Sequence, residues 1–139
     1  MGAIAELANQ TDRSLLIVED DKAFLERLSR AMETRGFDVT SCESVADGIS
    51  QIGKAAPAFA VVDLRLGDGN GLDVVSALKR KRPDARAIVL TGYGNIATAV
   101  TAVKMGAVDY LAKPADADDV VAALLSTNTE KSELPQNPM

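Results

Sequence analysis

The chain has 139 residues, 47% of them hydrophobic, which is enough to bury the core of one globular domain. A formal net charge of −5 argues against a basic nucleic-acid-binding surface, and a single cysteine, Cys42, excludes an internal disulfide. The chain has neither histidine nor a cysteine cluster, so a zinc site is not expected. It also has no signal-peptide pattern and no apolar run of about 18 residues, so we expect a cytoplasmic domain that makes no membrane contact.

The first ordered element is expected at Ser14. Residues 1–13 lack a strong hydrophobic period, so we interpret them as a leader. Leu15–Val18 form a short apolar run typical of a buried strand, and this run ends in consecutive acids, Glu19 and Asp20. The first strand therefore delivers carboxylates to its carboxyl end.

Strands and helices alternate along the rest of the chain. Apolar runs predict further strands over 37–41, 58–62, 87–90 and 108–112, and helical spacing predicts helices over 22–35, 45–53, 72–82, 95–105 and from 117 onward. Gly36 is placed as a left-handed C-cap, and Ser44, Asn70 and Asp116 as N-caps. Five such strand–helix units predict an α/β fold with a doubly wound, five-stranded parallel sheet and helices on both faces.

Polar groups directly follow three of these strands. Asp63 ends the third strand, Thr91 the fourth and Lys113 the fifth. Because ligands of open parallel sheets bind outside the carboxyl ends of the strands, these side chains and the acids of the first strand are expected to share one crevice. Converging carboxylates repel one another, and Mg²⁺, which prefers oxygen ligands and leaves positions open for a phosphoryl group, relieves that repulsion.

Asp63 is the candidate nucleophile of this site. A carboxylate beside Mg²⁺ can attack phosphorus and form an aspartyl phosphate. Lys113 would then act as a point charge, and the Thr91 hydroxyl as a donor, toward the phosphoryl oxygens. The next acid in the sequence, Asp68, is interpreted as a loop residue. The residues therefore predict a phosphoryl-accepting site at this edge of the sheet.

Four segments in this order and spacing resemble the receiver domain of two-component response regulators, over about residues 14–126. They are VEDD at 18–21, VVDLRLGDGNGLDVV at 61–75, LTGYG at 90–94 and DYLAKPAD at 109–116. In finer detail, TGYGNIATAVTAVKMGAVDYLAKPAD and the ending LPQNPM are similar to the RegA/PrrA/ActR group of redox-responsive global transcriptional regulators. The resemblance implies the flavodoxin-like (βα)5 receiver fold, and a signalling module whose only reactions are phosphotransfer to itself and autodephosphorylation.

The resemblance also implies roles in metal and phosphate chemistry. Asp63 would be phosphorylated by a sensor histidine kinase, with Mg²⁺ held by Asp63, by Asp20 directly and by the backbone carbonyl of Arg65. Glu19 would act on the metal through water. It stands where an aspartate is commoner, and its longer side chain leaves direct contact open as the alternative.

The resemblance further implies a conformational switch that involves residues of the last two expected strands. Thr91 and Tyr110 form the expected switch pair, and Lys113, which would contact phosphate, precedes an expected cis bond to Pro114. The expected output is homodimerisation through the face of the fourth helix, fifth strand and fifth helix. Residues 127–139 are interpreted as a linker toward a DNA-binding output domain that is not in this chain.

Four other interpretations remain. An Asp-nucleophile phosphatase of the haloacid dehalogenase kind needs an acid two residues after Asp63, where Arg65 stands. Residues 92–97 match a dinucleotide-binding fingerprint, but they lie in the fourth strand–helix unit and no suitable acid ends the next strand. A receiver used only for docking conflicts with the intact phosphoacceptor set. Cys42 is interpreted as a small buried hydrophobe, with a redox role as the alternative.

Overall fold

The computed structural model describes residues 12–92 and 96–126. Within them, five strands form one parallel sheet in the order β2-β1-β3-β6-β7. These strands are β1 (Ser14–Val18), β2 (Asp38–Cys42), β3 (Phe59–Asp63), β6 (Arg86–Thr91) and β7 (Asp109–Ala112). The chain first moves outward from β1 to β2 and then crosses back to β3, so the sheet is doubly wound, as predicted.

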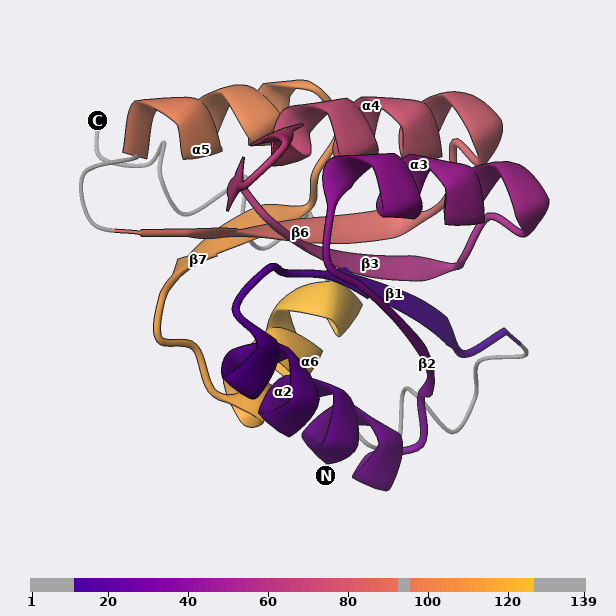
Figure 1. The fold of residues 1–139 in the computed structure, drawn as a ribbon, viewed down its shortest axis with the longest axis vertical. Coiled ribbons are helices and arrows are strands. Elements are labelled where there is room, and N and C mark those ends of the chain that lie inside the picture. Colours follow the sequence, from indigo (N-terminus) through magenta and orange to yellow (C-terminus); the bar gives the residue numbers. More distant parts are fainter. Residues whose placement is uncertain (1–11, 93–95, 127–139) are drawn as a thin grey trace.

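In the described part of the chain, five helices flank this sheet. Figure 1 shows that they cover both of its faces. Two of them, α2 (Lys22–Thr34) and α6 (Ala117–Leu125), lie on one face. The other face carries α3 (Val45–Lys54), α4 (Gly71–Lys81) and α5 (Ile96–Lys104). The predicted α/β class and the three-layer arrangement are therefore confirmed.

Successive residues of the central strand β3 contribute in turn to two separate cores. Phe59 and Val61 belong to the cluster beneath α2 and α6, whereas Ala60 and Val62 belong to the cluster beneath α3, α4 and α5. A parallel strand covered on both faces needs apolar side chains at every position, which explains the unbroken apolar run in the sequence. Asp63 is the last residue of this run and is itself buried.

The predicted helix caps are confirmed. Ser44, Asn70 and Asp116 each accept a hydrogen bond from a backbone N–H in the first turn of the helix that follows. Gly36 has a φ of 100°, in the left-handed region that favours glycine after a helix. These caps fix the directions in which the helices leave the sheet edge.

Several element bounds differ by one residue from the sequence-based expectations, and the structure contains one additional hairpin. The second strand begins at Asp38 rather than at Phe37, because the Phe37 N–H donates to the carbonyl of Met32 and closes the end of α2. A short antiparallel hairpin between β3 and α4 was not predicted at all. Its strands are β4 (Arg65–Leu66) and β5 (Gly69–Asn70).

Some expectations fall on residues that the structure does not describe. They are residues 1–11 of the leader, the linker at 127–139 and the start of the fourth helix at Asn95. Among residues 12–92 and 96–126, no helix combines the length and hydropathy needed to cross a bilayer.

Candidate functional site

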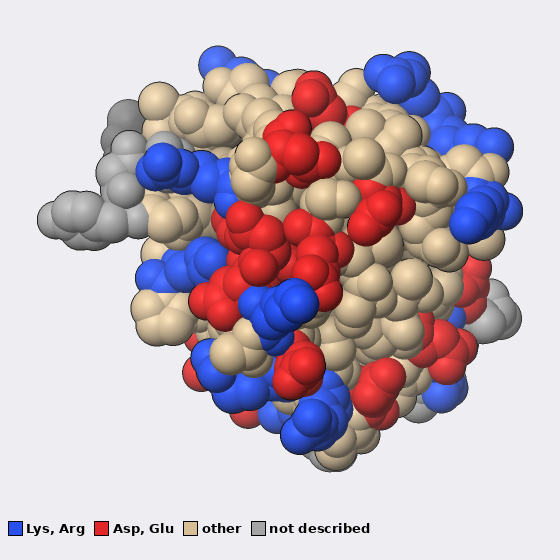
Figure 2. All heavy atoms as spheres, viewed as in Figure 1, with Lys and Arg blue, Asp and Glu red and all other residues tan. Residues whose placement is uncertain are grey.

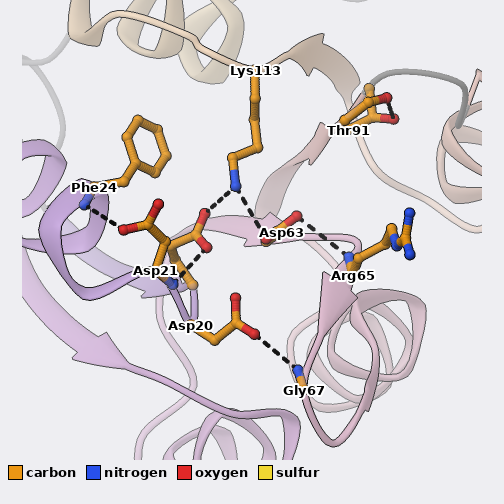
Figure 3. A network of polar contacts seen from close by, with 10 residues as sticks. Asp20, Asp21, Phe24, Asp63, Arg65, Gly67, Thr91 and Lys113 are labelled. Carbon is orange, nitrogen blue, oxygen red and sulfur yellow. Dashed lines mark hydrogen bonds and ion pairs between the residues drawn. The ribbon is translucent and has the colours of Figure 1, made fainter.

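Three acids meet at the carboxyl ends of β1 and β3. Glu19, Asp20 and Asp63 each offer a carboxylate oxygen, and these three oxygens lie within 4.8 Å of one another. Glu19 and Asp63 are buried, whereas Asp20 is exposed. Figure 3 shows the carboxylates of Asp20 and Asp63 side by side at this edge, and Figure 2 shows Asp and Glu side chains gathered near the middle of the corresponding face. Oxygen-only donors at this spacing are typical of a divalent metal site.

Lys113 brings the positive charge into this acidic cluster from the loop after β7. Its Nζ donates to Oε1 of Glu19 at 2.9 Å and to Oδ2 of Asp63 at 3.3 Å, and it lies 5.3 Å from the centre of the Phe24 ring. Burial alone would lower the pKa of Lys113, but the hydrogen bond to Glu19 and the charges of both carboxylates outweigh it and raise that pKa. The lysine is therefore held in its charged form.

Glu19 is the most enclosed member of the cluster, with a side chain only 1% exposed. Its Oε2 accepts a hydrogen bond from the Asp21 N–H at 3.0 Å, while its other oxygen is bonded to Lys113. Burial raises the pKa of Glu19, and these two hydrogen bonds offset that effect only in part. Among the described residues, one ammonium faces these three carboxylates and does not fully balance their charge, so the site is attractive to a further cation.

Asp63 lies at the end of β3, where the backbone of β3 and the backbone at the start of α4 approach each other very closely. Its Oδ1 accepts a hydrogen bond from the Arg65 N–H at 3.3 Å. Behind it, a Cβ atom added at Gly71 would lie 2.2 Å from the Asp63 carbonyl oxygen, so only glycine fits at the first position of α4. The Gly71 N–H also donates to the carbonyl of Leu64, which closes the loop beneath the acid.

The loop acids play two different parts. Asp20 belongs to the cluster, and its Oδ2 accepts a hydrogen bond from the Gly67 N–H at 3.0 Å. Asp68 does not belong to it, because its carboxylate accepts hydrogen bonds from the backbone N–H groups of Val45 and Ala46 at 2.8 and 3.1 Å. Sequence reasoning missed both contacts, because nothing in the pattern shows where this loop lies relative to Asp20 and to α3.

The other expected residues lie around the cluster rather than in it. Thr91 is 1% exposed, and its hydroxyl donates to the carbonyl of Gly92 at 3.1 Å. In Figure 3 Thr91 lies at the upper right, apart from Lys113 and the labelled carboxylates. Tyr110 is partly buried against the core under α3, α4 and α5, and the bond between Lys113 and Pro114 is cis.

Cys42 lies at the end of β2 and is 8% exposed. Burial, with the nearby charge of Asp47, raises the pKa of this thiol. A reactive cysteine needs the opposite shift, because the thiolate is the reactive form. The environment of Cys42 is thus that of a small core residue.

Comparison with known proteins gives one consistent result. The response regulator receiver domain family matches residues 15–125. Acid tolerance regulatory protein ActR from Sinorhizobium medicae is 65% identical over 128 residues, which are 92% of this chain and 66% of that protein. Photosynthetic apparatus regulatory protein RegA from Rhodobacter capsulatus is 60% identical over 135 residues, covering 97% of this chain and 72% of that protein. The chain therefore spans about two thirds of the length of these relatives.

A solved structure agrees with these sequence matches. A response regulator protein from Burkholderia pseudomallei, crystallised with a phosphorylated aspartic acid, calcium ion and citrate, is 40% identical to this chain. The two structures superpose with a TM-score of 0.80, over 92% of this chain and 76% of that one.

Proposed function

The chain belongs to the response regulator receiver domain family, and from this membership we propose that Asp63 accepts a phosphoryl group from a sensor histidine kinase. A receiver domain is a signalling module rather than a conventional enzyme. The observation that carries the proposal is the convergence of Glu19, Asp20 and Asp63 within 4.8 Å, with the Lys113 ammonium 3.3 Å from Asp63. We further propose that the domain spans residues 14–126 and works in the cytoplasm.

Mg²⁺ is the cation that we propose for the cluster. Asp63 and Asp20 offer carboxylate oxygens directly, and the backbone carbonyl of Arg65 lies in the hairpin that begins two residues after Asp63. Glu19 is enclosed and bonded to Lys113, which supports contact with the metal through water rather than directly. When bound, Mg²⁺ would neutralise charge on the phosphoryl oxygens.

In the reaction that we propose, one carboxylate oxygen of Asp63 attacks phosphorus while the bond to the kinase's histidine nitrogen breaks. The electron pair of that bond leaves with the imidazole ring, and an aspartyl phosphate remains. The Lys113 ammonium already donates a hydrogen bond to Oδ2 of Asp63, so it can contact the phosphoryl oxygens after only a short movement. Because Asp63 is buried while Lys113 is 26% exposed, water screens this interaction only in part.

Switching follows from the charge that phosphorylation adds. The phosphoryl group brings close to two negative charges, and the Thr91 hydroxyl, now bonded only to the adjacent Gly92 carbonyl among the contacts described, would turn toward it. Tyr110 would then move into the space that Thr91 leaves. To shift such an equilibrium from 1:99 to 99:1 takes about 5.5 kcal/mol of differential stabilisation, which several charge-assisted hydrogen bonds can supply.

The output that we propose is homodimerisation through α5, β7 and α6. Three large apolar side chains on α5, Ile96, Val100 and Val103, are exposed by 52%, 40% and 37%. Their spacing places them along one side of the helix, where a second copy could cover them. Any DNA contact would come from an output domain outside residues 14–126, because this chain carries a net charge of −5.

Phosphorylation with a small acyl phosphate and Mg²⁺ tests this function. Wild type should gain the mass of one phosphoryl group and elute earlier from a size-exclusion column, whereas Asp63→Asn should do neither. Asp47→Asn, which removes an acid from the first turn of α3 outside the cluster, is the matched control and should be labelled like wild type. Equal labelling of wild type and Asp63→Asn would refute the assignment.

A further inference from the structure

The hairpin between β3 and α4 contacts two of the three acids in the cluster. The Arg65 N–H donates to Oδ1 of Asp63, and the Gly67 N–H donates to Oδ2 of Asp20. Both donors are backbone groups, so their positions depend on the path of the hairpin. The antiparallel pairing of Arg65 with Asn70 and of Leu66 with Gly69 leaves residues 67 and 68 as the turn.

The turn of the hairpin is tied to a second element, the N-terminus of α3. The two oxygens of Asp68 accept hydrogen bonds from the N–H groups of Val45 and Ala46, the first two residues of that helix. A carboxylate is favoured there because the first N–H groups of a helix have no partner within it and carry partial positive charge. These two hydrogen bonds lower the pKa of Asp68, so it keeps its charge.

We infer that Asp68 is a positioning residue for the phosphoacceptor site. It anchors the turn of the hairpin to α3, and the hairpin in turn holds the carboxylate of Asp20 in its place in the cluster. This inference rests on the proposed function, since the cluster is taken to bind the divalent cation needed for phosphorylation. Asp20 is exposed, so without the Gly67 N–H its side chain would have to be ordered anew each time a cation binds.

A simpler role for Asp68 would be to cap α3 and nothing more. The structure separates the two roles, because α3 has a second cap whose hydrogen bond does not involve the hairpin. Ser44 accepts a hydrogen bond from the Asp47 N–H in the same first turn. Loss of Ser44 therefore removes a cap and leaves the hairpin anchored, whereas loss of Asp68 removes a cap and frees the hairpin as well.

The experiment compares Asp68→Ala and Asp68→Asn with Ser44→Ala, which is the matched control. Mg²⁺ affinity is measured by calorimetric titration of the unphosphorylated protein, and the anchoring of the turn by hydrogen exchange of the Gly67 amide. Asp68→Ala should weaken Mg²⁺ binding roughly tenfold, the lower end of the effect of losing an outer-shell partner of a metal ligand. It should also speed exchange at Gly67, and Asp68→Asn, which retains one oxygen acceptor, should fall between Asp68→Ala and wild type.

Ser44→Ala should keep the wild-type Mg²⁺ affinity and the wild-type exchange at Gly67, although it destabilises α3. If Asp68→Ala also keeps both, Asp68 only caps the helix and the inference is wrong. Failure of the proposed function gives a different result. Wild type would then not be labelled at Asp63, while the weaker Mg²⁺ binding of Asp68→Ala would still support the positioning role.

Discussion

Replacing Lys113 with methionine tests how strongly the acidic cluster depends on the Lys113 ammonium. Methionine keeps much of the length and apolar volume of the lysine but removes the ammonium. Glu19 then loses the partner at 2.9 Å from its Oε1, and Asp63 loses the partner at 3.3 Å from its Oδ2. Among the contacts described, Glu19 keeps the hydrogen bond from the Asp21 N–H, and Asp63 keeps the one from the Arg65 N–H.

The expected cost follows from the burial of the three side chains. Removing one partner of a buried ion pair typically costs about 3 to 5 kcal/mol, because the other charge stays buried without compensation. The carboxylates of Glu19 and Asp63 are 1% and 7% exposed, but the Lys113 side chain is 26% exposed, so water reaches this side of the site. We therefore expect the low end of that range, about 3 kcal/mol of the free energy of unfolding.

Urea denaturation in the presence of a chelator measures this cost. Lys104→Met, which removes an exposed lysine from the last turn of α5, is the control and should change the free energy of unfolding by less than about 0.5 kcal/mol. Adding Glu19→Gln to Lys113→Met should restore much of the loss, because one buried charge disappears. Mg²⁺ should narrow the gap to wild type, because without the competing ammonium the three carboxylates should bind the cation more tightly, and at saturating Mg²⁺ a tenfold lower Kd adds about 1.4 kcal/mol of stability. An unfolding free energy for Lys113→Met equal to that of Lys104→Met would refute this account of the cluster.

Two further predictions concern other parts of the fold. Gly71→Ala should lower the free energy of unfolding by about 3 kcal/mol or more, because the added Cβ would lie 2.2 Å from a backbone oxygen. Gly53→Ala should raise the free energy of unfolding by about 0.5 to 1 kcal/mol, because an added Cβ there has no atom within 4 Å. Thermal denaturation that ranks the two variants in the opposite order would contradict this reasoning. Hydrogen bonds from Ser14 lower the pKa of Asp12 to about 2, so Asp12 should stabilise the folded state above pH 4 and lose that effect as the pH falls toward 2. Because Asp12 is 43% exposed, the advantage over Asp12→Asn at pH 7 should stay below about 1 kcal/mol, and a gap that persisted at pH 2 would argue against this cause.

The fold was predictable because each element has its own signal in the sequence. The unbroken apolar run at Leu15–Val18 is what a strand covered on both faces requires, and all four residues are buried. Ser44 and Asp116 begin helices for a local reason, namely that a short polar side chain can bond a backbone N–H in the next turn. The acidic cluster was predictable in outline because parallel strand ends meet at one edge.

The contacts that were missed depend on how a loop lies against a distant element. Asp68 belongs to a short polar segment with no periodic pattern, so its hydrogen bonds to the start of α3 could not be read from the sequence. The pairing of Glu19 with Lys113 depends on the direction of the flexible Glu19 side chain. From the sequence alone, that side chain could equally point toward solvent or toward a bound metal. Neither question is decided by local sequence, because each needs the positions of residues far away in the chain.

The proposed phosphoacceptor and the expected switch residue face opposite layers of the sheet. Asp63 continues the alternation of Phe59 and Val61, whose side chains lie beneath α2 and α6. Thr91 continues the alternation of Val89, whose side chain lies beneath α3, α4 and α5. The two residues are therefore neighbours at the sheet edge but belong to different cores.

This arrangement gives the proposed switch a direction. The charge added at Asp63 appears on the side of α2 and α6, where Lys113 meets it, whereas Tyr110 and the exposed apolar residues of α5 lie on the other side. A turn of the Thr91 hydroxyl from the Gly92 carbonyl toward the phosphoryl oxygens would draw a group from the α5 side across the edge of the sheet. Thr91 would thus connect the proposed site of phosphorylation with the surface proposed for dimerisation.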